Sequence, residues 1–246
     1  MKPGEASRLR LAAFLAAACL PIAGPAIAVD VDLELVMAVD VSASVDEEEA
    51  ALQRQGYVAA LTHPQVIEAI RNGPLGRIAV TYVEWAGVSH QVTVLDWTVI
   101  EGEASARGFS AALAEAPLSA EVWTSISAMI DLAAALLDHN GFEGTRRVID
   151  ISGDGYNNRG RMEIVARDEA VARGITINGL PIVNERANRW GGLPPKDLDK
   201  YYEANVIGGP GAFMIVAQGY ESFADAILKK LVREIAASPP AAPALH

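Results

Sequence analysis

The chain has 246 residues, of which 51% are hydrophobic, and its formal net charge at pH 7 is −11. The length and the apolar content suit one α/β domain with a sizeable core. A chain this acidic is not expected to bind nucleic acid or an anionic membrane through a basic patch.

The first 28 residues have the features of a secretory signal peptide. Three basic residues precede an apolar run at 11–22, and Ala26-Ile27-Ala28 suits a cleavage site. The run is too short to span a bilayer comfortably. We therefore expect cleavage after Ala28, a location in the periplasm or outside the cell, and no stable membrane insertion afterwards. A membrane anchor and a lipid-modified Cys19 are the alternatives.

Strand-like and helix-like segments alternate between residues 31 and 237. Short apolar runs predict the strands, and longer segments with capping or stop signals predict the helices. In chain order, the expected elements are a strand at 33–39, a helix from about 47 to 61, helical turns at 64–71, strands at 77–84 and 91–95, helices at 104–115 and 125–138, a strand at 148–152, a helix at 163–173, a strand at 175–180, an irregular insertion at 184–196, a short helix at 197–205, a short strand at 213–216 and a helix at 223–235. The proline-containing tail 238–246 is expected to be disordered.

The connections between the strands predict the topology of the sheet. The turn at Ala86–Ser89 is short enough for a hairpin, so the third strand is expected to be antiparallel and at an edge. The other strands are separated by helices, which predicts parallel pairing and helices on both faces. We therefore predict a doubly wound α/β domain over residues 31–237. Its six-stranded, mostly parallel sheet would have the order 3-2-1-4-5-6.

Polar side chains follow the first and the fourth of these strands. Asp40, Ser42 and Ser44 come directly after the strand at 33–39, and Asp154 lies in the Gly-Asp-Gly turn after the strand at 148–152. In the predicted order these strands are neighbours where the winding reverses, and ligands bind at their carboxyl ends. Oxygen ligands of this kind suit a hard cation such as Mg²⁺. We expect Asp40 and Asp154 to face each other across a metal site.

These motifs resemble the metal-ion-dependent adhesion site of von Willebrand factor type A domains. The Asp-x-Ser-x-Ser of that site corresponds to Asp40, Ser42 and Ser44, its lone threonine to Thr124, and its distal aspartate, followed by Gly, to Asp154. More narrowly, the segments VDVSASVD, YVEWAG, VIDISGDG, GITINGLPI and VIGGPGAF resemble an uncharacterised bacterial family of exported type A proteins. The resemblance covers nearly the whole chain after the expected signal peptide, and it implies a type A fold.

The resemblance also implies what the site does. A protein partner would supply a Glu or Asp carboxylate to complete the octahedron that Mg²⁺ or Mn²⁺ requires. Trp123 and Tyr156 are expected at the rim that contacts this partner. No positioned general base is visible, so we expect a recognition site and not a catalyst. The five residues that would hold the cation are Asp40, Ser42, Ser44, Thr124 and Asp154.

Other interpretations stay open. A Mg²⁺-dependent phosphohydrolase could use Asp40 as its nucleophile, although such enzymes usually carry Asp-x-Asp and Ser42 stands at the second position. A type A fold can also serve as a metal-free scaffold. Thr124 could cap the helix at 125–138 instead of binding metal. Asp150 lies inside the fourth strand, is expected to be structural, and would need a partner if it is buried.

Overall fold

A computed structural model of the protein describes residues 28–184, 186 and 192–237. The expected signal peptide up to residue 27 and the expected tail 238–246 lie outside these residues. The strands are β1 (Val29–Val31), β2 (Leu33–Asp40), β3 (Ile78–Trp85), β4 (Gln91–Ile100), β5 (Phe142–Gly144), β6 (Arg147–Gly153), β7 (Ile175–Val183) and β8 (Ala217–Gln218). The helices are α1 (Glu47–Leu61), α2 (Pro64–Arg71), α3 (Glu103–Glu115), α4 (Ile126–Asp138), α5 (Glu163–Ala172), α6 (Leu198–Tyr201) and α7 (Phe223–Ala236), with a π-helical turn at Tyr202–Val206 and a 3₁₀ turn at Tyr220–Ser222.

The main sheet has the strand order β4-β3-β2-β6-β7-β8, and within it only β4 runs antiparallel to its neighbour. The predicted order 3-2-1-4-5-6 and the antiparallel third strand are therefore confirmed. β2 and β6 pair in parallel from Glu34 and Arg147 to Val39 and Ser152. Their carboxyl ends meet in the middle of the sheet, where the winding direction reverses.

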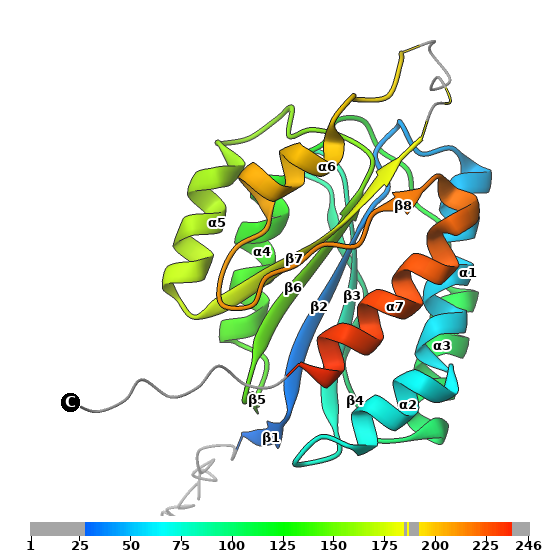
Figure 1. The fold of residues 1–246 in the computed structure, drawn as a ribbon, viewed down its shortest axis with the longest axis vertical. Helices are drawn as coiled ribbons and strands as arrows, with labels where there is room; N and C mark the ends of the chain where they lie inside the picture. Colours follow the sequence, from blue (N-terminus) through cyan, green and yellow to red (C-terminus); the bar gives the residue numbers. More distant parts are fainter. Residues whose placement is uncertain (1–27, 185, 187–191, 238–246) are drawn as a thin grey trace, which may run out of the picture.

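Helices cover both faces of this sheet (Figure 1). All eight residues of β2 are buried, and they alternate between the two faces. Leu35 and Met37 join the apolar cluster under α1, α2, α3 and α7, while Val36 and Ala38 join the cluster under α4 and α5. None of the described helices is long and apolar enough to cross a membrane.

The last strand differs from its prediction at 213–216. β8 is Ala217–Gln218, paired with the end of β7, and within 213–216 only Met214 forms an isolated bridge. The side chain of Asn178 accepts the hydrogen bond from the Phe213 amide (2.9 Å), and two backbone hydrogen bonds join Gly179 to Phe213 and Ile215, so the pairing there is limited to one bridge. The sequence also missed the separate parallel pair of β1 and β5, and β4 continues to Ile100.

Candidate metal site

The polar residues at the end of β2 and just after it form a chain of hydrogen bonds that reaches the turn after β6. Asp40 Oδ1 accepts a hydrogen bond from the Ser42 amide (2.7 Å), which turns the chain as the strand ends. Ser42 Oγ lies 3.0 Å from Ser44 Oγ, and Ser44 donates to Asp154 Oδ1 at 2.6 Å. The loop then ends at Asp46, which caps α1 in a capping box with Glu49.

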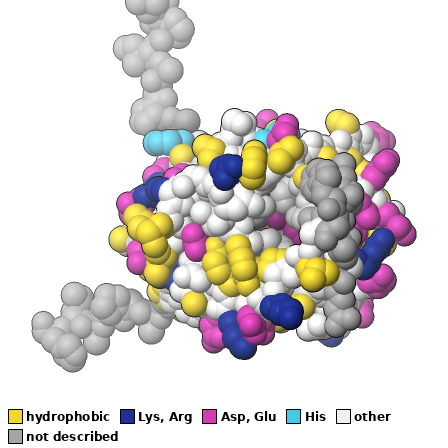
Figure 2. Space-filling view, turned by 90° about the horizontal axis from the view of Figure 1, so that it is seen from above, with side chains coloured by type: hydrophobic (Ala, Val, Ile, Leu, Met, Phe, Trp, Pro, Cys, Tyr) yellow, Lys and Arg dark blue, Asp and Glu magenta, His cyan; other side chains and the backbone are white. Residues whose placement is uncertain are grey.

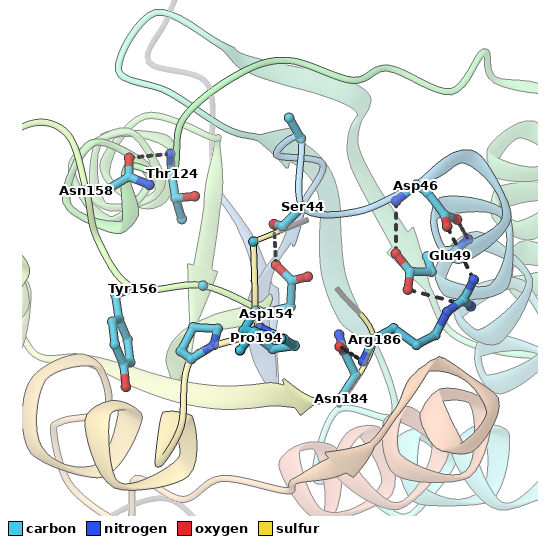
Figure 3. Close-up of a pocket in the computed structure, with 15 residues that line it drawn as sticks. Ser44, Asp46, Glu49, Thr124, Asp154, Tyr156, Asn158, Asn184, Arg186 and Pro194 are labelled. Carbon is cyan, nitrogen blue, oxygen red and sulfur yellow. Dashed lines mark hydrogen bonds and ion pairs between the residues drawn. The ribbon is translucent and has the colours of Figure 1, made fainter. Parts of the chain in front are cut away.

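Thr124 lies across the site from Ser44, on the loop before α4 (Figure 3). Its amide donates to Asn158 Oδ1 (2.9 Å), and its carbonyl accepts from the Asn158 amide (2.8 Å). Its hydroxyl faces Gly155, because a Cβ on that glycine would lie 3.5 Å from Thr124 Oγ1. Ser125 caps α4 with its own hydroxyl, so the interpretation of Thr124 as a helix cap is wrong.

Three of the five predicted ligand residues line one pocket of about 410 Å³. Ser44, Thr124 and Asp154 line the pocket, and Ser44 and Asp154 face each other at its centre (Figure 3). Asp40 and Ser42 are almost fully buried behind them. The remaining lining residues include Asp46, Glu49 and Arg186 on one side and Tyr156, Asn158 and Pro194 on the other.

The site buries two carboxyl groups close together. Burial raises the pKa of Asp40 to about 8, and the charge of Asp154 makes the second largest contribution. Burial also raises the pKa of Asp154. No cationic side chain among the described residues lowers the pKa of either, and Asp40 Oδ2 has no hydrogen-bond partner there. A buried carboxylate pair needs a compensating positive charge, so these residues fit a bound cation.

The chemistry of the donor atoms indicates which cation fits. Two carboxylates and three hydroxyls are all hard oxygen ligands, which Mg²⁺ and Mn²⁺ prefer. Among the described residues, no group of three or more His, Cys, Asp or Glu side chains is placed to hold a metal. The mixed set of carboxylates and hydroxyls is therefore the candidate, and it has no soft or imidazole ligand.

Both predicted rim residues lie at the surface beside the site. Trp123 is 49% exposed and has a φ of 74°, a left-handed conformation that a bulky residue adopts at a cost of about 1–3 kcal/mol. The guanidinium carbon of Arg159 lies 3.4 Å from its ring centroid. Tyr156 is 39% exposed and its ring packs against Tyr201. Figure 2 shows hydrophobic side chains around the hollow at this end of the molecule.

The sequence did not point to several residues that support the site. Asn158 fixes Thr124 through two hydrogen bonds, and Arg186 lies 3.7 Å from Asp46 and 3.9 Å from Glu49. Neither belongs to a motif, and each acts across a long sequence separation. No local sequence signal could therefore have found them.

Solved structures share this fold. The conserved hypothetical protein BatB from Bacteroides thetaiotaomicron is 18% identical, with 83% of this chain and 98% of that chain covered and a TM-score of 0.54. A von Willebrand factor type A protein from Catenulispora acidiphila is 13% identical, with 83% and 43% covered and a TM-score of 0.55. Proximal thread matrix protein 1 from the mussel byssus, solved with a zinc-occupied MIDAS motif, is 11% identical, with 85% and 49% covered and a TM-score of 0.56.

These likenesses establish the fold and no more. The chain matches less than half of the Catenulispora chain and about half of the mussel chain, and the aligned part is the type A domain fold. No curated protein matches the sequence. The model of a family described as "protein of unknown function (DUF1194)" matches residues 30–239, which is most of the chain. This protein is therefore a member of the DUF1194 family, and its domain has the von Willebrand factor type A fold.

Proposed function

We propose that this protein binds Mg²⁺ or Mn²⁺ at the candidate site and, through the cation, a Glu or Asp side chain of a protein partner. One observation carries the proposal. Asp40 and Asp154 are buried beside each other, linked through serine hydroxyls, with no cationic side chain beside them among the described residues. The residues that would hold the cation are Asp40, Ser42, Ser44, Thr124 and Asp154.

The protein itself orients these groups. Ser44 fixes Asp154, and Asn158 fixes the backbone of Thr124. A bound divalent cation would supply an electrophile for an incoming carboxylate, and the mussel protein with a zinc-occupied MIDAS motif makes a divalent cation plausible here. The exposed aromatic rings of Trp123 and Tyr156 would contact the partner around its acidic residue.

The site is proposed to recognise and not to catalyse. The carboxylates Asp46 and Glu49 also line the pocket, but they form the capping box of α1 and lie close to Arg186. No lysine lies among the described lining residues to hold a phosphate. We expect no turnover of p-nitrophenyl phosphate with Mg²⁺, and turnover that disappears in Asp40→Ala would favour the phosphohydrolase instead.

Calorimetric titration with Mg²⁺ and Mn²⁺ tests the metal site. Asp40→Ala should abolish binding because it removes a buried carboxylate, and Asp154→Asn should weaken binding because it removes one charge. Asp131→Ala is the matched control, since Asp131 is an exposed carboxylate on α4 that pairs with Arg161. Circular dichroism should show the same fold in all variants. If the wild type and Asp40→Ala bind cations equally, the metal-free scaffold replaces this proposal.

The partner is tested by capture from an envelope fraction. Wild-type protein should retain a partner with Mg²⁺ present and lose it with excess chelator, while Asp40→Ala should retain none. Trp123→Ala should reduce capture without changing the affinity for Mn²⁺, because the ring contributes contact area and no metal ligand. Capture that survives the chelator would contradict the metal-dependent mode of binding.

A further inference from the structure

Two tyrosine hydroxyls are buried near the metal site, those of Tyr202 and Tyr220. The Tyr202 hydroxyl has no hydrogen-bond partner among the described residues, whereas the Tyr220 hydroxyl interacts with Asp154. Tyr202 belongs to the apolar cluster under α4 and α5, and Tyr220 to the cluster under α1 and α7, so they approach from opposite faces of the sheet. A buried hydroxyl without a partner costs about 1–3 kcal/mol and is uncommon in native proteins, so that of Tyr202 requires an explanation.

The position of Tyr202 depends on two glycines on adjacent strands. A Cβ on Gly179 of β7 would lie 2.8 Å from Tyr202 Cδ1, and a Cβ on Gly153 of β6 would lie 2.9 Å from its hydroxyl oxygen. Side chains at either position would displace the ring. Tyr202 also begins the π-helical turn Tyr202–Val206, and such turns are frequent at functional sites. The local structure thus brings this phenol to the end of β6.

The unsatisfied oxygen of Asp40 lies beside the same glycine. A Cβ on Gly153 would lie 2.8 Å from Asp40 Oδ2, which also has no hydrogen-bond partner among the described residues. The Tyr202 hydroxyl and Asp40 Oδ2 do not bond to each other here, yet both pack against Gly153, so the two unsatisfied groups are neighbours.

Both hydroxyls can act as hydrogen-bond donors. A phenol has a usual pKa of about 10 and keeps its proton at neutral pH. The carboxylates Asp40 and Asp154 can only accept hydrogen bonds when they are ionised, so the two kinds of group are complementary.

We propose that Tyr202 is a positioning residue of the metal site, whose hydroxyl donates to Asp40 Oδ2 when the cation is bound and orients that carboxylate toward it. Tyr220 supports Asp154 from the opposite face, through the hydrogen bond between its hydroxyl and that carboxyl. This inference rests on the proposed metal binding and adds two residues outside the five-residue motif. Partners of metal ligands typically change metal affinity by about 10–100-fold when they are removed.

Titration with Mn²⁺ of the wild type, Tyr202→Phe and Tyr220→Phe tests this role. Each variant should bind Mn²⁺ about tenfold more weakly or worse. The urea midpoint of Tyr202→Phe in chelator should stay unchanged or rise, because the variant no longer buries an unsatisfied hydroxyl. Tyr57→Phe is the matched control, since its buried hydroxyl donates to Ser152 Oγ (3.4 Å). That variant should lower the urea midpoint and leave the Mn²⁺ affinity unchanged.

The outcomes separate this inference from the proposed function. A wild type that binds no Mn²⁺ overturns both. If the wild type binds Mn²⁺ and Tyr202→Phe binds it equally well, the positioning role alone is wrong. If Tyr202→Phe lowers both the Mn²⁺ affinity and the urea midpoint in chelator, the hydroxyl stabilises the fold as a whole. That result also overturns the positioning role.

Discussion

Short hydrogen bonds orient three of the proposed ligands in the protein without a cation. The Ser42 amide orients Asp40, the Ser44 hydroxyl orients Asp154, and Asn158 holds the backbone of Thr124. Each contact is 2.6–2.9 Å long. Groups that are already oriented lose less conformational freedom when they bind, so this arrangement should increase the affinity of the site for a cation.

The adjacent residues Thr124 and Ser125 have separable roles that substitutions can distinguish. Thr124→Val removes a hydroxyl ligand and should weaken Mn²⁺ binding by about tenfold, whereas Thr124→Ser should keep it. Ser125→Ala removes the cap of α4 and should lower the free energy of unfolding by about 1 kcal/mol without changing Mn²⁺ affinity. Titration and urea unfolding measure the two effects. A larger loss of Mn²⁺ affinity in Ser125→Ala than in Thr124→Val would remove Thr124 from the ligand set.

Between elements, the most unusual contact is ionic and lies between α7 and β6. Lys230 Nζ lies 2.5 Å from Asp150 Oδ1 and 2.6 Å from Glu234 Oε1, and all three side chains are almost fully buried. Asn178 of β7 also donates to Glu234 (3.0 Å). Lys230 is thus the partner that a buried Asp150 requires. Burial raises the pKa of Asp150 to about 7, and the charge of Glu234 makes the second largest contribution.

This cluster predicts that stability depends on pH. Folded Asp150 keeps its proton up to about pH 7, whereas the reference value for an unfolded aspartate is 3.8. The stability that this proton contributes is therefore fully present below pH 3.8 and is lost as the pH rises through about 7. Lys230, Glu234 and the phenol of Tyr57 are the groups that face Asp150.

Urea unfolding of the wild type and Asp150→Asn, from about pH 5 to pH 8, measures the effect. The variant cannot titrate at this position, so the free energy of unfolding of the wild type should fall relative to that of the variant as the pH rises. Taking the difference between the two proteins cancels the titration of Asp40 and Asp154. Parallel pH profiles would mean that Asp150 is ionised throughout this range.

On the scale of the whole molecule, the described ends of the chain lie away from the pocket. β1 and the last turn of α7 lie at the lower end of Figure 1, whereas the carboxyl ends of β2 and β6 lie at the upper end. The exposed rings of Trp123 and Tyr156 lie at the pocket end. Attachment of the chain at either described end would therefore leave the proposed binding surface free.

Export is the prediction that concerns the whole chain. The intact mass of protein recovered from the cell envelope or the medium should correspond to a chain that begins at Val29, because the residues before it have the pattern of a cleaved signal. Ala28→Leu should block processing and leave a longer product, since cleavage requires a small residue there. A mature chain that begins at Met1, or at a lipid-modified Cys19, would contradict the prediction.

The sequence by itself determined the sheet order, the antiparallel β4 and the meeting of Asp40 with Asp154. These features follow from short-range patterns: a buried strand ending at Asp40, a hairpin turn at Ala86–Ser89, and helical crossovers that pack with one handedness. The cap of α1 at Asp46 follows from local chemistry in the same way. Such features depend on residues close together in the chain, so they can be read without the tertiary structure.

Only the tertiary structure decided the features that join distant parts of the chain. Asn178 accepts a hydrogen bond from the Phe213 amide, the last strand lies at Ala217–Gln218, and Lys230 reaches Asp150 across the core. Tyr202 reaches the metal site because glycines on two neighbouring strands leave room for its ring. Each contact joins residues far apart in sequence, and its energy depends on the packing of both partners, which no local pattern encodes.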